Sequence, residues 1–172
     1  MDNLREILLE VLELKKLRRA GWIQNGIEEC ETVASHSWGV AWLVVALCPR
    51  ELDLQKALMM AIIHDIAEVR IGDITPHDGV ELEDKYRMEY TAIKDIFSGI
   101  EHCDDLLAIW LDYEMQESRE SMFVKTCDKL DMALQAQKYM LDTKKDLNEF
   151  IDSALEKISD NSLRDLANFN RH

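Results

Sequence analysis

An apolar helical face that ends in three ionisable residues constrains this sequence more than any other feature. Residues 54–68 repeat apolar side chains at the spacing of one helix face, and His64, Asp65 and Glu68 stand where further core residues are expected. Burying an imidazole and two carboxylates is costly unless a partner compensates them. A divalent cation is the simplest such partner, because imidazole nitrogens and carboxylate oxygens are common metal ligands.

Helical periodicity without a competing strand signal predicts an all-α fold. Only two Pro and six Gly interrupt the 172 residues. We expect one helical-bundle domain over residues 1–172, with its core at about 5–158 and a C-terminal tail at 160–172. About six to seven helices are expected, with a long loop over 21–34, and the helical segments are 3–19, 36–48, 54–70, 83–98, 103–117, 119–142 and 146–158.

The predicted helix over 36–48 is apolar around nearly its whole circumference, which indicates a central and buried position. Ser35 is its expected N-cap. His36 opens this helix, so a second imidazole is expected to face the core that His64 also faces. Two helices that each direct a His into one core favour a shared metal site over two unrelated structural residues.

A further acidic ligand is expected from the long helix over 119–142. Spacing alone places Asp131 inside the apolar stripe of this helix and Asp128 at the edge of the stripe, which slightly favours Asp131 as the ligand. Either residue could instead be a solvated or salt-bridged acid, so spacing leaves the choice between them open.

Charge and cysteine content restrict the partners and the compartment. The net charge of −14 argues against binding to nucleic-acid polymers or anionic membranes. Four Cys without a C-x-x-C pair indicate a reduced, cytoplasmic protein. The early acidic residues Asp2, Glu6 and Glu10 do not fit a signal peptide, and the longest apolar run, 40–48, is too short to span a membrane.

The order His36, His64-Asp65 and Asp128 resembles the H…HD…D pattern of the HD-domain metal-dependent phosphohydrolases. Two further stretches resemble the 5′-deoxynucleotidase subgroup of that family. The run 64–76 contains E-x-x-x-G-D-x-x-P after the HD pair, and the run 32–37 contains V-x-x-H-S. The resemblance covers roughly residues 5–140 and implies the HD-domain fold and hydrolysis of a phosphomonoester.

The resemblance also implies a metal site and a catalytic pair. It chooses Asp128 over Asp131, so the implied ligands of one divalent transition metal (Mn, Co, Fe or Zn) are His36, His64, Asp65 and Asp128. Glu68 and Asp73 match acidic residues that act near the attacking water and the leaving group.

The substrate contacts implied by the resemblance include one departure from the family. Trp22 matches an aromatic residue that senses the sugar, but Gly21 stands where the family has an Arg. Arg18 or Arg19 could supply that charge from a neighbouring position, and Lys125 could offset further phosphate charge. The implied substrate is a (deoxy)nucleoside 5′-monophosphate, cleaved to nucleoside and phosphate by a homodimer that uses an apolar strip on the last two helices.

Two alternative functions remain. Another HD-type enzyme, a cyclic-nucleotide phosphodiesterase or a two-iron oxygenase, would need two metal ions, and His77 and His102 are the spare internal histidines. A non-catalytic helical module would use the metal only structurally, and such sites are closed to water.

Overall fold

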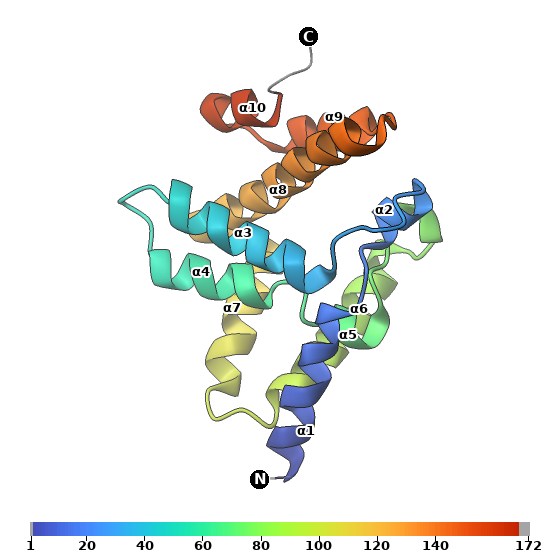
Figure 1. The fold of residues 1–172 in the computed structure, drawn as a ribbon. Helices are drawn as coiled ribbons and strands as arrows, with labels where there is room; N and C mark the ends of the chain where they lie inside the picture. Colours follow the sequence, from blue (N-terminus) through green and yellow to red (C-terminus); the bar gives the residue numbers. More distant parts are fainter. Residues whose placement is uncertain (1, 169–172) are drawn as a thin grey trace.

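The computed structural model describes residues 2–168, which form ten α-helical segments and two short 3₁₀ turns (Figure 1). The segments are α1 (Asp2–Val11), η1 (Leu12–Lys15), α2 (Ala20–Gln24), α3 (Val33–Leu47), α4 (Leu54–Ile63), α5 (Glu68–Ile71), η2 (Pro76–Asp78), α6 (Leu82–Phe97), α7 (Cys103–Met115), α8 (Arg119–Thr143), α9 (Asn148–Lys157) and α10 (Asn161–Ala167).

The prediction of an all-α fold is confirmed. Within 2–168 the β structure is limited to one isolated bridge, between Arg18 and Thr32. Segments outnumber the six to seven predicted helices because two predicted helices are interrupted and because α2, η2 and α10 lie outside the predicted helices. None of the helices described is both long and apolar enough to cross a membrane.

Helix α8 is the central element of the fold. It packs against α3, α4, α7, α9 and α10 (Figure 1). Helices α3 and α4 lie side by side, and α6 packs on α7. The two helices expected to carry the imidazoles therefore share the same long helix as a support.

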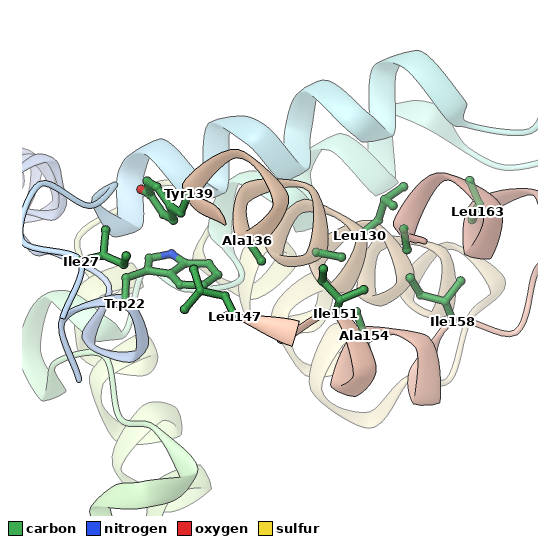
Figure 2. Packing of buried hydrophobic residues seen from close by; sticks show 12 residues of the cluster. Trp22, Ile27, Leu130, Ala136, Tyr139, Leu147, Ile151, Ala154, Ile158 and Leu163 are labelled. Atoms are coloured by element: carbon green, nitrogen blue, oxygen red, sulfur yellow. The ribbon is translucent and has the colours of Figure 1, made fainter. Parts of the chain in front are cut away.

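Three groups of buried apolar residues hold these helices together. The first joins α2, α8, α9 and α10, and its members include Trp22, Leu130, Ala136, Leu147, Ile151, Ile158 and Leu163 (Figure 2). The second lies beneath α1, α6 and α7, and the third fills the space between α3, α4 and α8. Leu163 and Ala167 of α10 are buried in the first group, so the described part of the predicted tail 160–172 is packed. Residue 1 and residues 169–172 lie outside the described residues.

The N-terminus of α3 differs from the sequence prediction. Thr32, not Ser35, is the N-cap: its Oγ1 accepts a hydrogen bond from the backbone N–H of Ser35 at 3.2 Å. The prediction of Ser35 as the cap was therefore wrong by three residues. Both residues have suitable hydroxyls, but starting the helix at Val33 buries that side chain completely.

The prediction that this helix is buried all round was also wrong. Its buried positions lie on the face that meets α4 and α8, whereas Trp38 is 71% exposed and Trp42 is 56% exposed. The apolar composition of a helix does not show whether another helix packs on each of its faces. Among residues 2–168, no element covers the outer face of α3.

The predicted helix over 54–70 is broken at residues 64–67. The backbone N–H groups of Glu68 and Arg70 donate to carbonyls three residues earlier, at 3.1 and 3.0 Å, so the backbone turns more tightly than an α-helix here. Trp110 donates its Nε1–H to the carbonyl of His64 at 3.3 Å. In an α-helix the carbonyl of His64 would accept from the backbone N–H of Glu68, and here it accepts from the indole of Trp110 instead.

The predicted helix over 3–19 ends early as well. Helix α1 stops at Val11, η1 continues to Lys15, and Arg18 and Arg19 follow in extended backbone. The two arginines are therefore not part of a helical C-terminus, and their side chains leave the chain in different directions.

Candidate metal centre and adjoining pocket

His64 directs a bare ring nitrogen towards a carboxylate. Its Nδ1 lies 2.9 Å from the carbonyl oxygen of Ala61. Because a carbonyl only accepts, Nδ1 carries the proton and Nε2 has a free lone pair. Nε2 lies 3.1 Å from Oδ2 of Asp65 without forming a hydrogen bond. Two acceptors that face each other in a buried space indicate a position for a cation.

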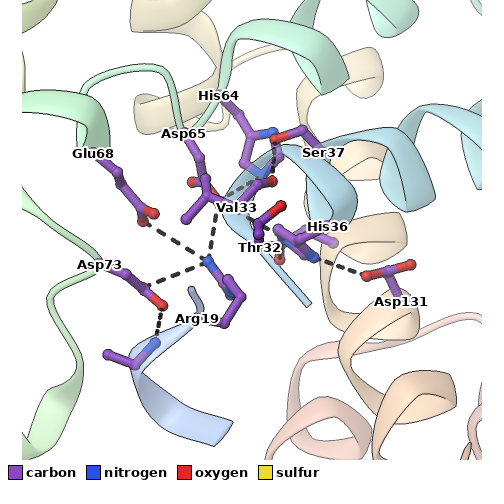
Figure 3. Close-up of polar contacts among 12 residues, drawn as sticks. Arg19, Thr32, Val33, His36, Ser37, His64, Asp65, Glu68, Asp73 and Asp131 are labelled. Carbon is purple, nitrogen blue, oxygen red and sulfur yellow. Dashed lines mark hydrogen bonds and ion pairs between the residues drawn. The ribbon is translucent and has the colours of Figure 1, made fainter. Parts of the chain in front are cut away.

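His36 approaches the same position from α3. Its Nδ1 lies 2.8 Å from Oδ2 of Asp131, and its Nε2 lies 3.7 Å from Oδ2 of Asp65 (Figure 3). Burial lowers the pKa of His36, as does Arg19, but Asp128 and Asp131 outweigh both and raise it to about 9. The surroundings of this ring thus favour a positive charge, which a second ring proton supplies without metal and which a metal ion at Nε2 would supply in its place.

The residues at this centre fit a divalent metal ion. The ligand atoms of His36, His64 and Asp65 all lie within 4.8 Å of one another. Among the described residues, the buried side-chain atoms without a hydrogen-bond partner are Nε2 of His36, Nε2 of His64 and Oε2 of Glu68. Unpartnered buried polar atoms are costly, and one ion would give both imidazole nitrogens a partner.

Asp128 faces His36 on the side opposite to Asp131. Its Oδ1 lies 3.3 Å from Nε2 of His36, and its Oδ2 accepts a hydrogen bond from the hydroxyl of Tyr113 at 3.2 Å. Burial opposes its ionisation, but Lys129 and His36 hold the pKa of Asp128 well below its usual range. Helical spacing had ranked the two acids the other way: Asp128 is buried, whereas Asp131 is only half-buried.

Arg19 lies within a ring of carboxylates at this centre (Figure 3). Its Nη1 is 3.2 Å from Asp65, 3.5 Å from Asp73 and 3.8 Å from Glu68. Burial opposes the charge of Arg19, but Asp65 and Asp73 raise its pKa above the usual range. This guanidinium is therefore charged and available to an anion that enters the site.

Glu68 is the acid of this ring that retains its proton most readily. Burial raises its pKa well above the usual value, and the charges of Asp65 and Asp73 raise it further. The pKa of Asp65 moves the other way: burial opposes ionisation, but His64 and Arg19 lower the pKa far below its usual range. Neighbouring carboxyls with pKa values pushed apart can serve as acid and as ligand.

Asp73 fixes the segment that carries Arg19. Its Oδ2 accepts the backbone N–H of Ala20 at 2.7 Å. The chain reaches Asp73 through Gly72, whose φ of 80° and ψ of 168° are essentially restricted to glycine. The turn after α5 thus returns a carboxylate to the start of α2.

A pocket of about 420 Å³ opens beside these residues, a size within the usual range for small-molecule sites. Its acidic side contains Asp65, Glu68, Asp73 and Asp128. The remaining lining includes Arg19, Trp22, Asn25, Lys85, Lys125, Lys129, Met132, Glu149, Phe150 and Ser153. The pocket therefore combines the candidate metal centre with cationic and aromatic side chains.

The predicted substrate-contacting residues do not all reach this pocket. Arg18 is exposed, donates to the carbonyl of Glu28 at 2.7 Å, and does not line the pocket. Lys125 does line it and donates to the hydroxyl of Tyr113 at 3.1 Å. Trp22 also lines it, but this residue is largely buried and its Nε1–H is donated to Glu31 at 2.9 Å.

The lining residues that sequence reasoning missed include Lys85, Lys129 and Phe150. Lys85 belongs to a strongly charged helix and carries no distinguishing pattern. Lys129 directly follows Asp128, so that adjacency was an available signal. Phe150 belongs to the apolar face of α9, and its ring centroid lies 4.3 Å from that of Trp22.

The helical fold and this cluster of His and Asp define a class of protein. A profile of the HD domain matches residues 11–168, and the chain belongs to the HD-domain family. The HD domain implies a divalent metal, which agrees with the two buried imidazole nitrogens that have no hydrogen-bond partner at the centre.

Relatives are similar over most of the chain. A Dictyostelium discoideum protein named 5′-deoxynucleotidase HDDC2 is 34% identical, over 97% of this chain and 96% of the relative. The Saccharomyces cerevisiae protein named 5′-deoxynucleotidase YGK1 is 33% identical, over 87% of this chain and 74% of its own. The crystal structure of the PH0347 protein from Pyrococcus horikoshii OT3 is 35% identical with a TM-score of 0.81, covering 94% of this chain and 98% of that one.

Proposed function

We propose that this protein is a metal-dependent phosphohydrolase that cleaves (deoxy)nucleoside 5′-monophosphates to nucleoside and phosphate. The observation that carries the proposal is a pair of buried, unpartnered imidazole nitrogens facing Asp65 at the wall of a pocket. The substrate class is supported by relatives, similar over most of the chain, that are named 5′-deoxynucleotidases.

The metal ligands we propose are His36, His64, Asp65 and Asp128. Two imidazoles and two carboxylates suit Mn²⁺, Co²⁺, Fe²⁺ or Zn²⁺ better than Ca²⁺. When bound, such an ion supplies positive charge for a phosphoryl group and makes water more acidic.

Glu68 is the proposed general acid. Its carboxyl lines the pocket, its pKa is raised by burial, and its Oε2 has no hydrogen-bond partner. A proton held on Glu68 can pass to the 5′-oxygen as that oxygen leaves phosphorus. Asp73 is proposed to support this step by holding Arg19 in the ring through its contacts with Ala20 and the guanidinium.

Arg19 and Lys125 are the proposed phosphate contacts, and Trp22 is the proposed wall beside the sugar. Arg19 takes this role in place of Arg18, because only Arg19 reaches the carboxylate ring. Burial opposes the charge of Lys125, but Asp128 raises its pKa, which keeps this lysine cationic beside the pocket.

We also infer that the protein acts as a cytoplasmic homodimer without nucleic-acid or membrane partners. The net charge of −14 disfavours both polyanionic partners. The proposed dimer contact moves from the last two predicted helices to α3, which exposes Trp38, Trp42 and Val45 on one face. Sedimentation equilibrium at micromolar concentration would report the assembly directly.

A substrate screen tests the proposed function. Purified protein is first shown to hold metal, then incubated with deoxynucleoside monophosphates, nucleoside monophosphates and a general phosphomonoester, with added Mn²⁺ or Co²⁺. We expect phosphate release from a 5′-deoxynucleotide. If the metal-loaded protein releases phosphate from none of these substrates, the proposal is wrong.

Glu68→Gln tests the proposed acid. Removing the proton donor should slow phosphate release by roughly 10²–10⁴-fold while leaving metal content unchanged. Glu114→Gln is the matched control, because burial also raises the pKa of this half-buried carboxyl, which lies outside the pocket lining. Equal activity of the Glu68→Gln variant and the wild type would remove Glu68 from the mechanism.

A further inference from the structure

We propose, building on the metal site proposed above, that Asp131 and Gly39 act together to position His36. Asp131 orients the imidazole so that its Nε2 points to the metal, and Gly39 provides the space that the Asp131 carboxylate occupies.

The contacts of His36 assign different tasks to the two aspartates of α8. Asp128 and Asp131 are three residues apart, so they share one side of the helix. Asp128 lies at Nε2 of His36, and Asp131 lies at Nδ1. Since a carboxylate accepts, the 2.8 Å contact with Asp131 holds a proton on Nδ1 and makes Nε2 the nitrogen that can offer a lone pair to a metal. Asp131 therefore selects the tautomer that can bind a metal.

Gly39 lies one helical turn after His36 on α3 and permits this contact. A Cβ at position 39 would lie 2.2 Å from Oδ1 of Asp131 and 2.9 Å from its Cγ. Both distances are far below van der Waals contact, so the carboxylate as a whole would have to move. A Gly inside a helix costs about 1 kcal/mol relative to Ala. Helix α3 is thus less stable with Gly than with Ala at position 39, which is the position that the Asp131 carboxylate approaches.

Glu31 is the other carboxyl beside this ring, and its contacts keep it in a different role. One of its oxygens lies within 4.8 Å of the ligand atoms of His36 and Asp131. Its Oε1 accepts the indole N–H of Trp22 at 2.9 Å, and burial raises its pKa. The hydrogen bond of His36 Nδ1 goes to Asp131, not to Glu31.

Loss of a hydrogen-bond partner behind a metal-binding His typically lowers metal affinity by about 10–100-fold. Asp131→Ala removes the partner directly. Gly39→Ala leaves the chemistry of Asp131 and His36 intact and disturbs only their geometry. Asp142→Ala is the control, because it removes an exposed carboxylate from the same helix.

The test measures Mn²⁺ affinity by calorimetry for the wild type and these three variants. We expect weaker binding, by about 10–100-fold, for Asp131→Ala and Gly39→Ala, and unchanged binding for Asp142→Ala. A second readout follows the His36 ring nitrogens by ¹H–¹⁵N NMR in the Zn²⁺-loaded protein. The wild type should show Nδ1–H, and Gly39→Ala should show a mixture of tautomers.

Each outcome decides a different point. Mn²⁺ affinities of Asp131→Ala and Gly39→Ala within twofold of wild type would overturn the positioning role while the metal site stands. A wild-type protein that binds no Mn²⁺ or Zn²⁺ would overturn both proposals. Should Asp131→Ala fail to fold, Gly39→Ala carries the test, because removing a helix glycine favours α3 unless the space is needed.

Discussion

Replacing Arg19 by Met should destabilise the metal-free protein much more than replacing its neighbour Arg18. Arg19 is largely buried and faces Asp65 and Asp73, whereas Arg18 is exposed and contacts a backbone carbonyl. Both substitutions remove one positive charge and keep an unbranched side chain. The two substitutions therefore differ mainly in the groups that the lost guanidinium contacts.

The contact distances give the magnitude. At an effective dielectric constant of about 20, a unit charge 3.2 Å from Asp65 and 3.5 Å from Asp73 gains roughly 5 kcal/mol from each. Dehydration of the guanidinium offsets much of that gain. Breaking a buried ion pair from one side costs about 3–5 kcal/mol, which is the loss expected for Arg19→Met. Arg18→Met should cost less than about 1 kcal/mol.

Urea unfolding in the presence of EDTA measures both free energies. Addition of Mn²⁺ gives a second comparison: carboxylates that have lost Arg19 should bind the ion more tightly, so Arg19→Met should gain more stability from metal than wild type gains. The reasoning is refuted if both arginine variants unfold at the same urea concentration in EDTA.

Two further predictions concern residues around the site. Trp110→Phe leaves the freed carbonyl of His64 without its donor, so it should cost about 1–3 kcal/mol in urea unfolding. Burial raises the pKa of Glu89 from 4.5 to about 7, so the folded chain binds more protons than the unfolded chain and stability falls as pH rises through that window. The free energy of unfolding of Glu89→Gln should therefore rise relative to that of wild type by up to about 3 kcal/mol between pH 4.5 and pH 7. A difference between the two proteins that stays constant across this range would contradict the raised pKa of Glu89.

The sequence could predict that His36, His64 and Asp65 lie close together, because ionisable side chains at buried positions are costly without a shared partner. Ionisable side chains that continue an apolar face need compensation, and the structure brings the ligand atoms of these three residues within 4.8 Å of one another. The all-α fold followed from the same periodicity.

Other features depend on geometry that periodicity does not encode. A period of 3.6 residues fails where the backbone tightens at 64–67, and it misjudged the burial of Asp128 and Asp131 on α8. The choice between Arg18 and Arg19 depends on the direction of an extended segment that pairs with Thr32. No pattern of apolar residues could tell that residues 2–168 leave the outer face of α3 uncovered.

The uneven burial of the four tryptophans gives this protein a built-in optical probe. In the single chain Trp38 and Trp42 are open to solvent, so at concentrations where the protein is monomeric a water-soluble quencher such as acrylamide reaches their indole rings. Trp22 and Trp110 are buried, one in the wall of the pocket and the other bonded to the backbone of His64. Fluorescence that survives quenching therefore comes mainly from two indoles in contact with the site, and its change on adding metal or nucleotide follows occupancy without a label.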